Sequence, residues 1–203
     1  MADAPRLILA SGSAARRAML EASGLAFDVV PADLDEDAIT AAMTSESACV
    51  EAADVASMLA VEKALSIARV NPGALVIGAD QTLALGTRLI SKATTMQEAR
   101  AVLDSLRGRT HELASAVALA RDDAILWQGV DSAQMTMRRF SDEFLSVYLQ
   151  RMGNRALKTV GCYELEGLGA QLFERIDGDY FTVVGMPLLP LLAELRRRGV
   201  IAG

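Results

Sequence analysis

The first residues able to do chemistry lie near the amino end, where a short apolar run gives way to Ser11-Gly12-Ser13. Arg16 and Arg17 follow within the next turn of a predicted helix. Backbone N–H groups at the start of a helix are unpaired and attract anions, and arginine adds charge-assisted hydrogen bonds. The segment therefore indicates either a phosphate site or a capped helix with solvated arginines.

Carboxylates gather in two further places. Asp33-Leu34-Asp35-Glu36-Asp37 forms an acidic loop, and Asp80 follows directly on the apolar run 75–79, at the expected end of a strand. Carboxylate oxygens suit Mg²⁺, and an aspartate at a strand end can orient or deprotonate an attacking water. The alternatives are a solvated loop and an Asp80 that accepts hydrogen bonds from the amides of a turn.

Two lysines and one glycine-containing loop complete the set. Lys63 interrupts a helix that is mostly Ala, Leu and Ile, and Lys92 lies just beyond a predicted hairpin. Each either binds phosphate as a point charge or belongs to an exposed polar stripe. The glycines in 164–169 allow that loop, which contains Glu166, to pack closely against a ligand.

These residues fall at the boundaries of predicted strands and helices. Apolar and alternating runs predict strands at 6–10, 27–30, 75–79, 89–90, 111–120, 134–140 and 171–176. Capping and stop signals predict helices at 14–23, 51–70, 95–108, 141–152 and 188–198. Strands and helices alternate early and a meander dominates the middle, so we expect a mixed α/β fold with a curved sheet and flanking helices.

Composition narrows the class of protein. The 203 residues form either one domain over 1–203 or two closely packed lobes. The net charge of -6 argues against nucleic-acid binding, although a locally cationic cleft can still hold a small anion. The sequence has neither an apolar run of about 20 residues nor a signal peptide, so we expect a cytoplasmic protein without a membrane partner. Two distant cysteines, Cys49 and Cys162, and a single His111 argue against zinc.

Taken in order, these segments resemble the Maf family of nucleoside triphosphate pyrophosphatases, and the resemblance runs from Leu7 to about Gly199. No single motif is decisive, but the ordered series is specific. The matching segments are 7–13 with 16–17, 35–36, 62–64, 78–80, 91–92, 108–111, 166–169, 173–176, 178–180 and 184–187.

The resemblance implies a deep cleft between two lobes, an architecture similar to that of the inosine triphosphate pyrophosphatases, and often a homodimer. Family members hydrolyse the α–β phosphoanhydride with a divalent cation, here Mg²⁺, Mn²⁺ or Co²⁺. By motif, Asp80 would accept the proton and would bind the metal with Glu36. The triphosphate would be held by Ser11, Ser13, Arg16, Lys63 and Lys92. Such a cluster supplies the counter-charge that phosphoryl chemistry needs. His111 has no role in this scheme, and we expect it to be structural.

The family's subgroups differ at positions that are Ala15, Gln81 and Glu166 in this sequence. Gln81 and Glu166 resemble the subgroup that acts on 7-methyl-GTP, and a carboxylate can accept hydrogen bonds from the N1–H and N2–H₂ edge of guanine. Ala15 departs from the large side chain of both subgroups, so the pocket is expected to be wider or differently closed. Ser91-Lys92-Ala93 also replaces the usual Gly-Lys-Pro. A dTTP/UTP-type enzyme and a nucleotide-binding regulator of septum formation remain as alternatives.

Overall fold

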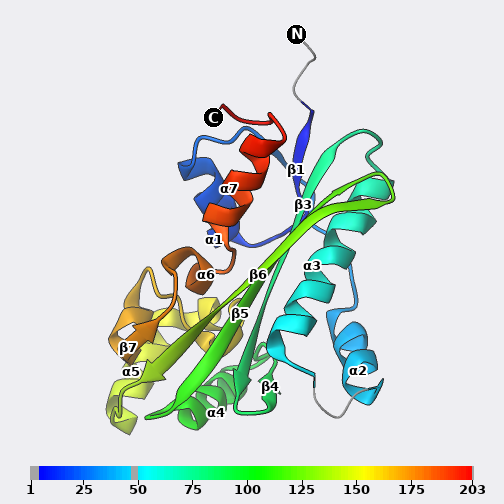
Figure 1. Ribbon diagram of the computed structural model, residues 1–203. Coiled ribbons are helices and arrows are strands. Elements are labelled where there is room, and N and C mark those ends of the chain that lie inside the picture. Colours follow the sequence, from blue (N-terminus) through cyan, green and yellow to red (C-terminus); the bar gives the residue numbers. More distant parts are fainter. Residues whose placement is uncertain (1–4, 47–49, 203) are drawn as a thin grey trace.

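One seven-stranded sheet runs through the computed structural model, which describes residues 5–46 and 50–202 (Figure 1). The strand order is β2-β1-β3-β5-β6-β7, and β4 pairs with β3. β1 pairs in parallel with β2 and β3, and the other pairs are antiparallel. The strands are β1 (Leu7–Leu9), β2 (Asp28–Val29), β3 (Leu75–Leu85), β4 (Arg88–Ile90), β5 (Thr110–Arg121), β6 (Ala124–Met137) and β7 (Phe173–Asp177). The sheet is mixed, as predicted.

Helices flank this sheet on both faces. The α-helices are α1 (Ala14–Ala22), α2 (Glu36–Glu46), α3 (Ala52–Arg69), α4 (Met96–Leu106), α5 (Asp142–Met152), α6 (Tyr180–Val184) and α7 (Leu188–Arg197). Short 3₁₀ helices η1 (Gly153–Leu157), η2 (Val160–Cys162) and η3 (Leu168–Leu172) connect α5 to β7. Ser13, Thr95 and Ser141 cap α1, α4 and α5 through their side chains, which confirms those predicted helix starts.

Helix α3 packs against one face of the long strands through small residues. Ala56, Ala60 and Ala64 are buried against an alanine-rich stretch of β5. At Gly78 the contact with β3 is so close that an added Cβ would lie 2.1 Å from the carbonyl oxygen of Ala60. This absence of side chains holds α3 directly on β3 and so fixes which α3 residue meets Asp80.

Two separate groups of helices cover the other face. α1 and α7 pack with β1 and the first part of β3, whereas α4 and α5 pack with the far part of β3 and with β5 and β6. Figure 1 shows α1 and α7 near one end of the long strands and α4 and α5 near the other. The short helix α6 contacts α1, α7, β5 and β6. The predicted mixed sheet with flanking helices is thus confirmed.

Three predicted boundaries are wrong. The strand expected to end at Asp80 continues to Leu85, because residues 80–84 pair with β5 in antiparallel register. The acidic loop ends at Asp35, whose Oδ1 accepts a 2.9 Å hydrogen bond from the Ala38 N–H, so that Glu36 and Asp37 occupy the favourable first turn of α2. Finally, β6 begins at Ala124, not at 134, since pairing with β5 overrides the weak strand propensity of its Gly, Asp and Ser residues.

Both cysteines were noted in the sequence, and only one can be placed. Cys162 is a buried free thiol, and Cys49 lies outside the described residues. Across 5–46 and 50–202, no helix combines the length and the hydropathy that crossing a bilayer requires.

Candidate functional site

A break in the edge of β3 creates the candidate site. β1 pairs with β3 only at residues 75–77, and β4 pairs with the same edge only at residues 83–85. Between them, residues 78–82 have no strand neighbour on this side among the described strands. Asp80 lies at the centre of the break. The sequence suggested a strand end, but the structure places Asp80 in the middle of a strand whose neighbours stop short of it.

Lys63 joins two carboxylates at this break. Its Nζ lies 2.6 Å from Glu36 Oε1 and also donates a hydrogen bond to Asp80 Oδ1. Lys63 is 6 % exposed and Asp80 4 % exposed, which rules out the exposed polar stripe as an explanation of Lys63. Buried charges persist only when they are paired, and here one ammonium group compensates two carboxylates from separate elements.

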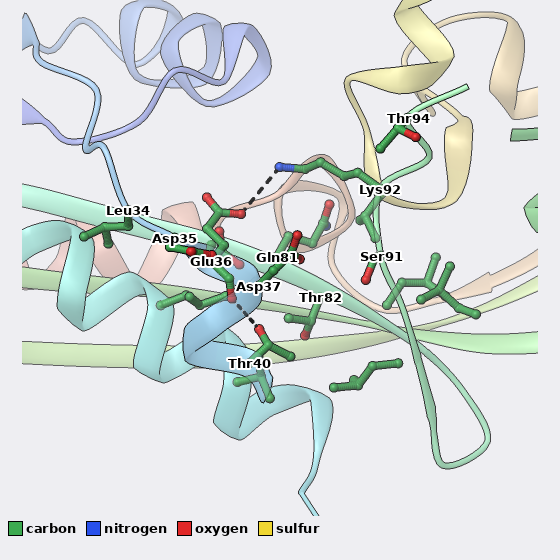
Figure 2. A pocket seen from close by; sticks show the side chains of 17 residues that line it. Leu34, Asp35, Glu36, Asp37, Thr40, Gln81, Thr82, Ser91, Lys92 and Thr94 are labelled. Carbon is green, nitrogen blue, oxygen red and sulfur yellow. Dashed lines mark hydrogen bonds and ion pairs between the residues drawn. The ribbon is translucent and has the colours of Figure 1, made fainter. Parts of the chain in front are cut away.

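Glu36 faces a second cation across the cavity. Lys92 Nζ lies 3.8 Å from Glu36 Oε2, and Figure 2 shows the Lys92 side chain extending toward that carboxylate. Burial opposes ionisation of Glu36, but the hydrogen bond and charge of Lys63, together with the charges of Lys92 and Arg16, hold its pKa below the ordinary value. Glu36 is therefore ionised at neutral pH. The Lys92 side chain is 52 % exposed, so its ammonium group is accessible to a ligand.

Arg16 anchors α1 to the break. Its Nε donates to the Gly185 carbonyl at 2.8 Å, and its Nη1 donates to Ser11 Oγ at 3.1 Å and to the Ala79 carbonyl at 2.9 Å. Burial lowers the pKa of Arg16, against the raising effect of Asp80 and Glu36, but a guanidinium stays protonated in proteins. Within the described part of the chain, Nη2 makes no hydrogen bond. Arg16 thus holds the scaffold and keeps one amino group for a ligand.

The two serines lie at the start of α1. Ser13 Oγ accepts a 3.4 Å hydrogen bond from the Arg16 N–H, and Ser11 Oγ accepts a 3.3 Å bond from the Ser13 N–H. Both hydroxyls therefore shape the turn. The cap predicted at Ser13 is confirmed, but the alternative of solvated arginines is wrong for Arg16, which is buried. The capped end of α1 lines the cleft at Ser13 and Ala15.

Two cavities meet at the break. The first, about 410 Å³, lies on the α3 face and is lined by Glu36, Asp80 and Lys92 among others. The second, about 100 Å³, includes Ser13 and Arg16 in its lining. Asp80, Gln81, Lys92 and Val160 line both cavities. The cavities therefore form one cleft that passes around the open edge of β3. Ser11 and Lys63 lie behind its wall, in contact with lining residues.

The three predicted specificity residues, Ala15, Gln81 and Glu166, all line the second cavity. Gln81 uses its side-chain nitrogen inside the fold: Nε2 donates to Ser115 Oγ at 3.0 Å and to the carbonyls of Thr182 at 3.1 Å and Val183 at 3.0 Å. Only its Oε1 remains for a ligand. Glu166 is exposed on a loop, and Ala15 presents a methyl group.

Sequence reasoning missed a second wall of this cavity, formed by Lys158, Thr159 and Tyr163. Thr159 Oγ1 is buried and has no hydrogen-bond partner among the described residues. The available signal was a lysine and a hydroxyl, Lys158 and Thr159, separated from Gly161 only by Val160. Gly161 has a φ of 78°, which allows the chain to turn there.

His111 lies behind that wall. Its Nε2 is 2.7 Å from the Tyr163 hydroxyl, and the ring is 1 % exposed. Burial lowers the pKa of His111 to about 4, so the imidazole is neutral at pH 7. It lines neither cavity of the cleft. His111 therefore contacts the wall residue Tyr163 but does not line the cleft.

The donor set fits a divalent cation shared with a ligand. With Lys63 on Oε1 and Oδ1, Glu36 Oε2 and Asp80 Oδ2 remain as oxygen donors beside the first cavity. The described residues contain no group of three or more side chains suited to a metal ion. Mg²⁺ is commonly held by one or two carboxylates plus substrate phosphates, which matches this pair.

This fold and cleft are found in a chain that belongs to the Maf family, since the family model described as "Maf-like protein" matches residues 6–198. A protein named 7-methyl-GTP pyrophosphatase from Brucella abortus is 50 % identical over 198 residues, 98 % of each chain. One of the same name from Rhizobium meliloti is 50 % identical over 97 % of this chain and 98 % of its own. A protein named nucleoside triphosphate pyrophosphatase from Caulobacter vibrioides is 50 % identical over 95 % and 96 %.

Proposed function

We propose that this chain is a nucleoside triphosphate pyrophosphatase, which hydrolyses the α–β phosphoanhydride to a nucleoside monophosphate and pyrophosphate. The observation that carries the proposal is the break in the edge of β3, where Asp80 and Glu36 meet three cations, Lys63, Lys92 and Arg16. Relatives half identical over nearly the whole chain carry this activity in their names.

The free cationic groups of the cleft would bind the triphosphate. Lys92 is half exposed between the two cavities, Arg16 has one unused amino group, and the capped start of α1 adds its backbone N–H groups. A triphosphate brings several negative charges, and fixed cations stabilise them without reorganisation during the reaction. Ser11 and Ser13 contribute by holding the turn in front of α1.

Asp80 would accept the proton of the attacking water. Lys63 occupies Oδ1 and keeps the carboxylate oriented, so Oδ2 is the free oxygen: one of its lone pairs would hold the ion and the other would accept the proton. As the water oxygen bonds to phosphorus, its proton passes to Asp80, the bridging P–O bond breaks, and pyrophosphate leaves with the electron pair of that bond.

We include Mg²⁺, Mn²⁺ or Co²⁺ as the cofactor, held by Glu36 and Asp80 together with phosphate oxygens. When bound, the ion neutralises phosphate charge and polarises the P–O bonds. The protein itself holds the two carboxylates next to each other, because the Lys63 ammonium group pairs with both.

For the base we favour guanine methylated at N7. Glu166 lines the second cavity, and its carboxylate can accept hydrogen bonds from the Watson–Crick edge of guanine. The 7-methyl-GTP pyrophosphatases among the relatives support this choice. A cytoplasmic homodimer that binds no nucleic acid stays a prediction from the sequence.

A pyrophosphate-release assay tests the function. The purified chain is incubated with 7-methyl-GTP, GTP, dTTP and UTP in the presence of Mg²⁺, Mn²⁺ or Co²⁺, and the products are separated by ion-exchange chromatography. We expect pyrophosphate and monophosphate in equal amounts, with 7-methyl-GTP the best substrate. Release of orthophosphate, or tight binding without any cleavage, would contradict the proposal. A preference for dTTP and UTP would contradict the choice of base alone.

A further inference from the structure

A third cavity adjoins the cleft and differs from it in chemistry. This apolar groove, about 470 Å³, lies between α1 on one side and α6 and α7 on the other. The walls that concern us are formed by Ala18, Met19 and Ala22 of α1, Phe181 of α6, and Leu188 and Leu192 of α7. Figure 1 shows α1, α6 and α7 close together, with α6 nearer the middle of the long strands.

The α1 wall is built for an open groove. Ala15, Ala18, Met19 and Ala22 follow the spacing i, i+3, i+4, i+7, which places them on one face of the helix. Three of these four side chains are methyl groups, so the α1 side chains do not fill the space between α1 and the facing helices α6 and α7. Large apolar residues remain exposed nearby, including Leu189 at 57 %. An apolar surface of this kind on a folded protein marks a binding surface.

The groove is continuous with the cleft. Ala15, Glu166 and Val184 line both the second cavity and the groove, and we call these three residues the junction. The second cavity is in turn joined to the first at Asp80. The three cavities therefore form a series that runs from the charged groups at Asp80, past the carboxylate of Glu166 at the junction, to a mainly apolar groove. At the junction Ala15 contributes only a methyl group, which leaves the passage open.

We infer that the apolar groove is a subsite for a hydrocarbon substituent on the base of the nucleoside triphosphate. The inference rests on the proposed function, because it takes the phosphates to be at Asp80 and the base to be beside Glu166. An occupant that extends past the junction meets mainly apolar walls, so a hydrocarbon group gains more contact there than a polar group does. The two hydroxyl residues of the lining are Ser23, which donates to the Leu20 carbonyl, and Tyr180, which is 52 % exposed. The substrate class is thus extended to nucleotides whose bases carry apolar groups larger than methyl.

The test compares substrates that differ only in the size of that group. The probes are GTP, 7-methyl-GTP and GTP carrying a benzyl group on N7 or on N2. Pyrophosphate release gives kcat/KM for the wild-type chain and for Ala18→Leu and Ala22→Leu. Both alanines are exposed and line the groove but not the cleft, and leucine is a strong helix former. Ala41→Leu, at an exposed position of α2 outside these cavities, is the matched control.

We expect the wild type to cleave at least one benzylated nucleotide as well as it cleaves 7-methyl-GTP. The groove variants should lose about tenfold or more in kcat/KM for that substrate, through KM, because a single methylene in an apolar pocket has effects of about this scale and leucine adds three carbons to alanine. Their kcat/KM for 7-methyl-GTP should be unchanged, and Ala41→Leu should match the wild type on every substrate. Thermal melts at the wild-type temperature show that the variants are folded.

Two results would overturn the inference while the proposed function stands. The first is cleavage of 7-methyl-GTP with no cleavage of either benzylated nucleotide. The second is an equal response of all substrates to Ala18→Leu and Ala22→Leu, above all if light scattering shows that these variants dissociate a dimer, which would assign the groove to a second copy of the chain. If the wild type cleaves no nucleotide at all, the proposed function itself fails, and the inference fails with it.

Discussion

Two buried polar pairs border the cleft, and they differ in charge although burial disfavours ionisation in both. Lys63 and Asp80 meet on the α3 face as ions, and Glu36 joins them. His111 and Tyr163 meet behind the second cavity as neutral groups. Desolvation disfavours charge at both places, but only the first has an opposite charge within hydrogen-bonding distance. The two places thus differ in whether an opposite charge lies nearby, and not in whether they are buried.

The comparison also explains why the single histidine misleads. A lone histidine in an enzyme sequence attracts a catalytic assignment, because its ordinary pKa lies near neutrality. Here no carboxylate supports the imidazolium, and burial lowers the pKa of His111 to about 4. The ring is held by a hydroxyl and by aromatic neighbours, Tyr163 and Phe173. These contacts indicate that His111 packs behind the second cavity and supports the wall that contains Tyr163.

Removing the charge of Asp80 should have the largest effect. Asp80→Asn keeps the shape and the Lys63–Glu36 contact but removes the carboxylate that we propose as the base, so we expect kcat to fall by ~10²–10⁴-fold on every nucleotide. Steady-state pyrophosphate release measures this, and circular dichroism checks that the variant is folded. Turnover like that of the wild type would remove Asp80 from the chemistry and make the pair merely structural.

Removing Lys63 should break the charged pair as a unit. Lys63→Met leaves Asp80 buried without its hydrogen-bonded counter-charge, with only the more distant Arg16 remaining, and we expect a loss of ~3–5 kcal/mol in the free energy of unfolding by urea. The double variant Lys63→Met/Asp80→Asn is the matched control, because it removes both charges and should recover much of that loss. If the single variant is as stable as the wild type, Asp80 is not held in the way described.

The neutral His111–Tyr163 pair should make the stability of the protein depend on pH, because burial opposes protonation of His111. The pKa of His111 is about 4 in the folded chain against an ordinary 6.5. The unfolded chain therefore binds the proton first, and the stability due to neutral His111 is present above pH 6.5 and lost as the pH falls toward 4. Between pH 7 and pH 5 we expect the wild type to lose ~2 kcal/mol more than His111→Gln in urea unfolding. Parallel losses in the two proteins would show that His111 does not titrate in this way.

The smallest effect should come from the hydroxyl of the neutral pair. Tyr163→Phe removes the 2.7 Å hydrogen bond to His111 Nε2. His111 Nδ1 has no partner among the described residues either, so both ring nitrogens would be buried without one. We expect a loss of about 1–2 kcal/mol in unfolding free energy, less than for Lys63→Met because no charge is stranded. A larger loss than for Lys63→Met would reverse the comparison.

The sequence predicted best what local chemistry decides. The capping residues Ser13, Thr95 and Ser141 correctly predicted the starts of three helices, and the apolar run 75–79 correctly predicted the first part of β3. The ordered motifs identified the family, and all three residues chosen for specificity line one cavity.

The pairing of strands that are far apart in the chain could not be predicted from the sequence. Asp80 looked like a strand end because polar Gln81 and Thr82 follow it, yet β5 extends the strand. The break in the edge of β3 depends on two short strands, β1 and β4, that stop before they meet. No local pattern encodes where they stop. The wall formed by Lys158 and Thr159 likewise depends on the path of a loop, not on a repeat or a cap.

The break in β3 leaves main chain as part of the binding surface. Peptide groups alternate along a strand, and those of Leu75, Ile77 and Ala79 face this edge, where they bond to Arg6, Ala10 and Arg16. The same alternation turns the N–H and C=O of Gln81 toward the cleft. Those two groups belong to the backbone, so no side-chain replacement deletes them. If positions 15, 81 and 166 select the base as we propose, substitutions there would change that choice while one main-chain donor and one acceptor stay in place.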